Sequence, residues 1–499
     1  MLAAAASAED ARTHEANALY KEFVKLGRKP GRTEYKRRAK IIWRLGELLP
    51  QSREALLKIP ARSRVPYELV LVAYQIGDIE TPDVRDLLVK HATRFKEPVL
   101  AGIISERMIK NFDEVGRAWV ADVALKSTNE VVCELGCHLA WGKKMKGAGD
   151  ALRALQKRSM RNRKRERTTY LATGALLYSG AATREEALAW AKSDALPLRM
   201  AAARVVPYLP PEGMGGVTEV LLRDTDWRIR RRTLRSIGGS KHESHWAHLI
   251  TALEKDPRLA CRATAHDGLV QISKRDLDYD VQAWRRWLKD RKTVPVEQAK
   301  KRTYSHARYY GQSVVADRVC FVVDLSTSMK RPTNHPTPRI AVARSELKRA
   351  LEGLSESTRF NIVVFSNEAR AWRQRPTQAT KKRIAQAQKW IDEEFTPGGQ
   401  THTWQAIELA FATDKDLDTI YLLSDGSPSM GKWRNYPDTA WALDTIVWKR
   451  QITVHTVALS LSDLFKKKKG SAEEFGEGYM RRVAKATGGR FTVIATPPE

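Results

Sequence analysis

The hydrophobic pattern of this chain changes its period once, close to residue 300, and that change limits the folds open to it. Before the change, apolar residues recur every three to four positions, which is the spacing of amphipathic helices. After it, short apolar segments alternate with helical ones, an order that predicts parallel strands joined by helices. A basic stretch broken by Pro295 separates the two patterns, so we place a linker at 292–316. The sequence therefore predicts an all-α domain at 9–291 and an α/β domain at 317–499.

The helical segment contains a motif that repeats along the chain. An Asp and a short turn open a helix at three places, where Leu198, Ile229 and Leu259 take the same position, 31 and 30 residues apart. The pattern resembles the HEAT repeat, clearly in these three units and more weakly back to Asp83, although the usual HEAT period is somewhat longer. Such units bury their apolar faces against each other, so we expect a HEAT-like solenoid with an extended surface for partners.

The α/β segment is predicted to form a doubly wound parallel sheet. Continuous apolar runs predict strands at 318–325, 359–365, 419–424, 452–459 and 490–495, and helical spacing predicts helices at 340–354, 381–393, 403–412, 439–449 and 479–487. In such a sheet, ligands bind beyond the carboxyl ends of the strands. Any functional site of this segment is therefore expected in the loops that follow its strands.

Three of these loops carry side chains with oxygen atoms. The residues are Asp324, Ser326 and Ser328 after the first strand, Thr401 in a Gly-rich loop that precedes a helix, and Asp425 after the third strand. Because the carboxyl ends of parallel strands meet at one edge, we expect these side chains to converge. Carboxylates and hydroxyls without a soft ligand suit a hard cation, namely Mg²⁺, Mn²⁺ or Ca²⁺.

The three motifs D-x-S-x-S, G-G-x-T-x-T and D-G, in this order, resemble the metal-ion-dependent adhesion site of the von Willebrand factor type A domain. The resemblance covers about Asp317–Ala495, with Gln400 as an insertion relative to the tighter G-G-T form. It implies that Ser326 and Ser328 bind the ion directly, that Thr401 binds directly or through water, and that the two aspartates act partly through water. In related domains, a Glu or Asp of a partner protein fills the open coordination position. The alternative is an ion that only holds three loops together.

This resemblance implies a non-enzymatic, divalent-cation-dependent protein-interaction or scaffold protein. The net charge of +29, from 87 basic and 58 acidic residues, also favours a polyanionic partner. Basic clusters such as Arg228–Arg235 would then bind RNA phosphates along the repeats. Helical repeats before an A domain also describe the Ro autoantigen family of RNA-binding proteins, which supplies the alternative function. An accessory subunit of an AAA+ ATPase is a further alternative.

The sequence leaves the location of the protein open. No apolar run is long enough to span a membrane, so we expect a soluble protein without a membrane span. The start, Met1–Asp10, resembles the small-residue end of a secretory signal but lacks the apolar core of one. Both a cytoplasmic and an exported protein are therefore consistent with the sequence.

Overall fold

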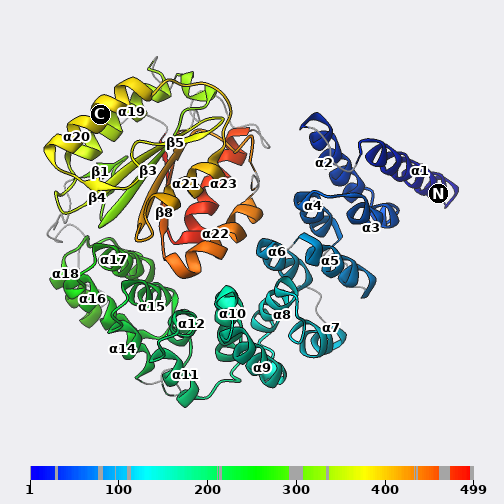
Figure 1. Ribbon diagram of the computed structural model, residues 1–499, viewed down its shortest axis with the longest axis horizontal. Coiled ribbons are helices and arrows are strands. Elements are labelled where there is room, and N and C mark those ends of the chain that lie inside the picture. Colours follow the sequence, from blue (N-terminus) through cyan, green and yellow to red (C-terminus); the bar gives the residue numbers. More distant parts are fainter. Residues whose placement is uncertain are drawn as a thin grey trace. The chain divides into compact units, whose positions relative to one another are not determined.

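The computed structural model describes residues 2–27, 32–76, 82–95, 97–109, 114–210, 212, 216–290, 307–332, 337–431, 433, 436–459 and 472–494. The chain forms two compact units, Met1–Ala187 and Leu188–Glu499, which we describe one after the other (Figure 1). This division differs from the predicted one, since the last helices before residue 291 belong to the same unit as the sheet.

Helices make up the first unit in its described residues. They are α1 (Leu2–Lys25), α2 (Arg32–Glu47), α3 (Arg53–Arg62), α4 (Pro66–Ile76), α5 (Pro82–Phe95), α6 (Pro98–Met108), α7 (Glu114–Trp119) with the π-turn η2 (Val120–Ala124), α8 (Glu130–Gly142), η3 (Lys146–Ala148), α9 (Gly149–Met160), η4 (Arg163–Arg165) and α10 (Glu166–Tyr178). Asn129 begins α8 by accepting hydrogen bonds from the N–H groups of Val131 and Val132. This cap satisfies donors that the first turn of a helix leaves free.

Part of the positive charge of this unit is buried in ion pairs. Arg38 and Glu68 form a bidentate pair with Nε–Oε1 and Nη2–Oε2 distances of 2.8 and 2.6 Å, and both side chains are almost fully buried. Arg167 of α10 pairs with Glu134 of α8 through Nη1 and Oε2, and both side chains are buried. These arginines hold helices together, and because each is paired with a glutamate, their burial leaves the net charge of the remaining residues unchanged.

The second unit begins with further helices, and α11 (Arg184–Ala191) lies at its boundary. They are α12 (Leu196–Val205), η5 (Val206–Tyr208), α14 (Val217–Leu222), α15 (Trp227–Gly239), η6 (Glu243–His245), α16 (Trp246–Lys255), α17 (Leu259–Ser273) and α18 (Val281–Lys289). The repeated Asp of the sequence motif explains where α15 begins, because Asp226 caps it by accepting from the N–H of Arg228 at 3.0 Å. Asp256 accepts from the N–H of Arg258 at 2.9 Å in the turn between α16 and α17.

The helices that carry the repeated motif stack in order, α12 on α15 and α15 on α17. Leu198 and Ile229 are buried near the start of their helices, which explains why an apolar residue recurs at this position. Equivalent helices of neighbouring sequence repeats thus share one core, as they do in repeat proteins. The more specific resemblance to HEAT repeats stays a prediction.

A mostly parallel sheet follows the helices, as predicted. The parallel strands lie in the order β4 (Arg359–Phe365), β3 (Arg318–Asp324), β7 (Thr419–Ser424), β8 (Thr453–Leu459) and β9 (Phe491–Ile494), and the short β5 (Ala369–Ala371) and β6 (Thr377–Gln378) pair antiparallel with β4. Helices α19 (Arg339–Glu352) and α20 (Lys381–Glu394) cover one face of the sheet, and α21 (Thr403–Thr413), α22 (Tyr436–Arg450) and α23 (Ala472–Thr487) cover the other (Figure 1). The predicted doubly wound fold is confirmed.

The segment predicted as a linker is folded where the structure describes it. Residues 291–306 lie outside the described residues, but β1 (Arg308–Tyr309) and β2 (Gln312–Ser313) form an antiparallel hairpin. Its turn residues Tyr310 and Gly311 have φ angles of 50° and 77°. Positive φ at both central residues is what the type I′ turn of a two-residue hairpin requires. Both tyrosines are buried in the core under α19, so residues 307–316 are part of the α/β fold. Their short, aromatic sequence carries no alternating pattern that predicts a strand.

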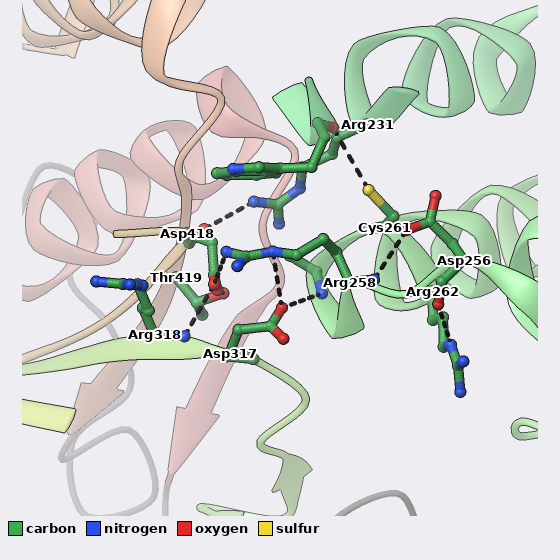
Figure 2. A network of polar contacts seen from close by, with 12 residues as sticks. Arg231, Asp256, Arg258, Cys261, Arg262, Asp317, Arg318, Asp418 and Thr419 are labelled. Atoms are coloured by element: carbon green, nitrogen blue, oxygen red, sulfur yellow. Dashed lines mark hydrogen bonds and ion pairs between the residues drawn. The ribbon is translucent and has the colours of Figure 1, made fainter. Parts of the chain in front are cut away.

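Residues of α15 and α17 and of the turn before α17 form hydrogen bonds and ion pairs with the sheet, at the edge where its parallel strands begin. Arg231 of α15 is 2% exposed and donates from Nη1 to the backbone oxygens of Asp418 and Gln451, each at 2.8 Å. Its Nη2 donates to the hydroxyl of Thr453 at 2.7 Å. One side chain thereby binds the starts of β7 and β8, and Figure 2 shows it pointing from the helix toward Asp418.

Two further arginines complete this contact. Arg258, just before α17, lies 3.4 Å from Asp317 and 3.6 Å from Asp418 through its Nε and Nη2 atoms (Figure 2). Arg490, just before β9, pairs with Asp267 of α17 at 2.5 Å. These polar contacts lie at the edge where the strands begin, opposite the edge where the strands end.

Candidate functional site

The predicted site residues lie at the edge of the sheet where the strands end. Asp324 is the last residue of β3, and Asp425 follows β7. The two strands are parallel neighbours, with Val323 opposite Leu423, so both carboxylates are brought to the same edge. Ser326 and Ser328 stand in the turn after β3, which continues into the short helix η8 (Thr327–Lys330). The topology of the sheet is thus the reason that residues a hundred positions apart meet.

Direct hydrogen bonds connect four of the five residues. Asp324 accepts from the N–H of Ser326 at 2.7 Å. The hydroxyl oxygens of Ser326 and Ser328 are 3.0 Å apart, and the Ser328 hydroxyl donates to Asp425 Oδ1 at 2.7 Å. The other oxygen of Asp324 accepts from the hydroxyl of Ser424 at 2.6 Å, a contact that the sequence did not predict. The result is a compact group of oxygen atoms.

Thr401, the fifth residue, is attached through backbone contacts of its loop. The N–H of Thr327 donates to the oxygen of Gly399 at 3.1 Å, which joins the loop to the turn after β3. Thr401 is 8% exposed, and its N–H donates to the hydroxyl of Ser429 at 3.0 Å. Gly399 has a φ of +81°, a left-handed conformation that explains the glycine at this position. The loop therefore holds Thr401 beside the first and third motifs.

Burial dominates the electrostatics of Asp324. Asp324 is fully buried, and burial together with the nearby Asp425 raises its pKa to about 7, although hydrogen bonds from Ser424 and Ser326 act in the opposite direction. Two carboxylates so close together are costly unless a positive charge offsets them. The site thus favours a cation.

Arg339 supplies one such charge, and sequence reasoning missed it. It is the first residue of α19, it is 1% exposed, and its Nη1 donates to Asp425 Oδ2 at 2.5 Å. Its Nη2 is also buried and has no hydrogen-bond partner among the described residues. No motif marks an arginine at the start of a helix as a partner of a loop carboxylate, so only the fold reveals it.

The chemistry of the donor set fits a hard divalent cation. Two carboxylates and one guanidinium leave one net negative charge when all three groups are ionised, and the hydroxyls of Ser326, Ser328 and Thr401 add neutral oxygen donors. Within the described residues, no three His, Cys, Asp or Glu side chains are grouped so that they could hold a metal ion. Hydroxyl oxygens would therefore have to complete any coordination here.

The basic cluster at Arg228–Arg235 differs from its predicted role. Its arginines are engaged inside the molecule: Arg228 pairs with Asp226 at 2.8 Å, and Arg230 pairs with Asp256 at 2.8 Å. Arg231 is buried against the sheet, and Arg235 donates to Thr453 at 3.0 Å. The expectation that these side chains line a groove for RNA phosphates is wrong for Arg231, because its guanidinium is already bound by backbone oxygens. Two further basic clusters of the sequence, at 300–302 and 466–469, lie outside the described residues.

Comparison with known proteins identifies the domain in which the candidate site lies. Residues 317–467 match the family model of the von Willebrand factor type A domain. This part of the chain is a von Willebrand factor A domain. The A domain thus includes all five predicted site residues, and its described part contains β3 through β8.

Curated relatives share this region of the chain. Human von Willebrand factor A domain-containing proteins 3B and 3A are 29% and 27% identical over 189 and 190 residues, each match covering 37% of this chain. Mouse inter alpha-trypsin inhibitor heavy chain 4 is 30% identical over 129 residues, or 24% of this chain. The chain spans only 13%, 14% and 13% of the lengths of these relatives.

Among solved structures, a von Willebrand factor type A protein from Catenulispora acidiphila is similar over 36% of this chain and 39% of its own, with 19% identity and a TM-score of 0.29.

No helix in the described residues is both long and apolar enough to cross a membrane.

Proposed function

We propose that this chain is a non-enzymatic interaction protein whose A domain binds a protein partner through a divalent cation, Mg²⁺ or, in its place, Mn²⁺ or Ca²⁺. The observation that carries the proposal is the hydrogen-bonded group of Asp324, Ser326, Ser328 and Asp425 at the edge where the strands end. When bound, the ion would supply an electrophilic position that accepts a carboxylate from outside. Thr401, whose loop is hydrogen-bonded to the turn after β3, would complete the donor set.

Each of the chain's own residues has a distinct part in this proposal. Ser326 and Ser328 would donate neutral oxygen atoms and leave the positive charge of the ion largely uncompensated. Asp324 and Asp425 would supply the negative charge that makes binding favourable. Arg339 would hold Asp425 in place and limit the negative charge of the site, which leaves more of the ion's charge for a partner.

The position of the site supports an interaction role. The helices of the second unit contact the sheet where its strands begin, through Arg231 and Arg258. The strands β3 and β7 are seven and six residues long, so about 20 Å of sheet separates that contact from the candidate site. A partner could therefore bind the site without displacing the helices of this unit. Relatives that share the A domain include the inter-alpha-trypsin inhibitor heavy chains, named as parts of an inhibitor.

The experiment is a pull-down from the native host lysate with the full chain as bait. We expect specific partners to be lost with EDTA, to return with Mg²⁺, and to be absent with Asp324→Asn, which preserves side-chain shape. Asp392→Asn is the matched control, because Asp392 is an exposed carboxylate on α20 that pairs with Lys348. If every specific partner remains with EDTA and with Asp324→Asn, the adhesion function is wrong.

The alternatives gain no specific support. Arg231 is not available for RNA binding through Arg228–Arg235, because its side chain is buried against the sheet. The names of the relatives do not point to RNA or to an AAA+ ATPase. The cation-dependent interaction is thus the function that this structure supports best.

A further inference from the structure

A groove with a volume of about 310 Å³ lies between α14 and α16 and reaches down to α15. Glu219, Leu222 and Arg223 form one wall, and His248, Ala252 and Lys255 belong to the other. On α16 the lining residues 248, 251, 252 and 255 are spaced by three and four, so they share one face of the helix. The groove is large enough for one or two side chains of a ligand.

The centre of the groove is apolar. Leu234 of α15 is fully buried at its floor. Leu222 and Ala252 are partly exposed on the two walls. An aliphatic side chain placed between them would bury apolar surface on both partners, which stabilises a complex by roughly 25 cal/mol for each Å² removed from water.

Two positive charges at the groove are not compensated. Arg223 and Lys255 are exposed, and neither side chain has a hydrogen-bond or ion-pair partner among the described residues. The other charges of the groove are already paired. Arg230 is bound to Asp256 at 2.8 Å, and His248 lies 3.5 Å from Glu219. The groove thus offers an apolar centre beside two free cations.

We propose that this groove binds a peptide segment of a partner protein, with an aliphatic side chain flanked by carboxylates. The aliphatic side chain would enter between Leu222 and Ala252, and the carboxylates would pair with Arg223 and Lys255. Charge complementarity selects an acidic segment. A nucleic acid fits less well, because it has no aliphatic side chain to enter the apolar centre between Leu222 and Ala252.

This surface is separate from both the contact with the sheet and the candidate cation site. On α15, Arg230 and Leu234 face the groove, whereas Arg231 and Arg235 face the sheet one position further round the helix. No residue of the groove belongs to the A domain, and the inference does not depend on the proposed cation site. The chain would then hold two partner segments by different chemistry.

The test pans a phage library of random dodecapeptides against the immobilised full chain in the presence of EDTA. We expect the enriched peptides to share an aliphatic residue beside Asp or Glu. A synthetic peptide of the enriched sequence is then titrated against purified chains. The double variant Arg223→Glu/Lys255→Glu should weaken its affinity at least tenfold, and Ala252→Phe, which fills the groove without changing charge, should weaken it as well.

The matched control is Lys192→Glu/Lys241→Glu, which makes the same change in net charge at two exposed lysines outside the groove. This variant should bind the peptide as the wild type does. Enrichment of sequences without acidic residues, equal affinity for the Arg223→Glu/Lys255→Glu variant, or displacement of the peptide by an equimolar oligo-dT would overturn the proposal. Because EDTA is present throughout, failure here says nothing about the cation site, and success does not require it.

Discussion

Arg231 of α15 donates a hydrogen bond of 2.8 Å to the backbone oxygen of Asp418, a residue 187 positions later in the chain. The same guanidinium reaches Gln451 and Thr453, so one helix residue connects the starts of two neighbouring strands. Burial lowers the pKa of Arg231, and the carboxylate of Asp418 counteracts this shift. The last helices and the A domain therefore share a polar contact that is buried and directional, in which Nη1 and Nη2 of Arg231 donate three hydrogen bonds.

Replacing Arg231 should destabilise this unit strongly. Arg231→Met keeps much of the aliphatic stem but leaves the backbone oxygen of Gln451 without its donor in a buried place. We expect a loss of about 3 kcal/mol, typical of breaking a buried charged network. Thermal melting measures it, with Lys241→Met at an exposed position as control. Equal melting temperatures for the two variants would show that the contact does not hold the unit together.

Asp418 should make the stability of this unit depend on pH. Burial raises its pKa to about 6, although Arg231 acts against the shift. Since an unfolded Asp titrates near 3.9, the folded state binds the proton more tightly, and this contribution to stability is lost as the pH rises from about 4 to about 6. Urea unfolding at pH 4, 5, 6 and 7 should show the free energy of unfolding of the wild type falling relative to that of Asp418→Asn, because only the wild type loses a bound proton over this range. Parallel profiles would contradict the shift.

A close approach of two helices depends on glycine. A Cβ added at Gly238 of α15 would lie 2.7 Å from the Cα of Gly268 in α17, which is closer than real Cβ contacts come. Gly238→Ala should therefore push the helices apart and lower stability by about 1 to 3 kcal/mol, despite the better helix propensity of Ala. Gly478→Ala in α23 is the control, because a Cβ there has nothing within 4 Å. Thermal melting should show a lower melting temperature for the first variant and an unchanged or higher one for the second.

Arg339 should weaken cation binding while it stabilises the chain without metal. Its guanidinium pairs with Asp425 Oδ2 at 2.5 Å, so it competes electrostatically with any ion bound beside that carboxylate. We expect Arg339→Met to bind Mn²⁺ about tenfold more tightly, because removing a nearby positive charge lowers repulsion. The metal-free variant should melt at a lower temperature, since Asp425 loses its partner. Isothermal titration and thermal melting of the same preparations measure both effects, and weaker Mn²⁺ binding by the variant would contradict this assignment.

The strands of the A domain were readable from the sequence because each is a continuous apolar run with polar neighbours. The strand predicted at 359–365 has the same bounds in β4, and that predicted at 318–325 ends one residue earlier in β3. The order of strands and helices then fixes the edge at which Asp324 and Asp425 meet. Motif and topology together were enough to bring four of the five predicted residues into one hydrogen-bonded group.

The arginines show what the sequence could not reveal. In a basic helix, Arg231 has the same sequence context as the partly exposed Arg230 and Arg232. Its partners are backbone oxygens, which leave no trace in the identity of a residue. Arg339 likewise depends on a loop carboxylate that folding alone brings near. A run of basic residues predicts a positively charged, solvent-exposed surface only when no residue distant in the sequence buries those side chains.

The most direct test of the central claim is the binding of Mn²⁺ to the purified full chain, measured by electron paramagnetic resonance of the free ion. We predict saturable binding close to one ion per chain, competition by Mg²⁺, and loss of binding in Asp324→Asn but not in Asp392→Asn. A bound ion should also raise the melting temperature of wild type with increasing Mn²⁺. Absence of saturable binding, or equal binding by wild type and Asp324→Asn, would contradict the proposed cation site.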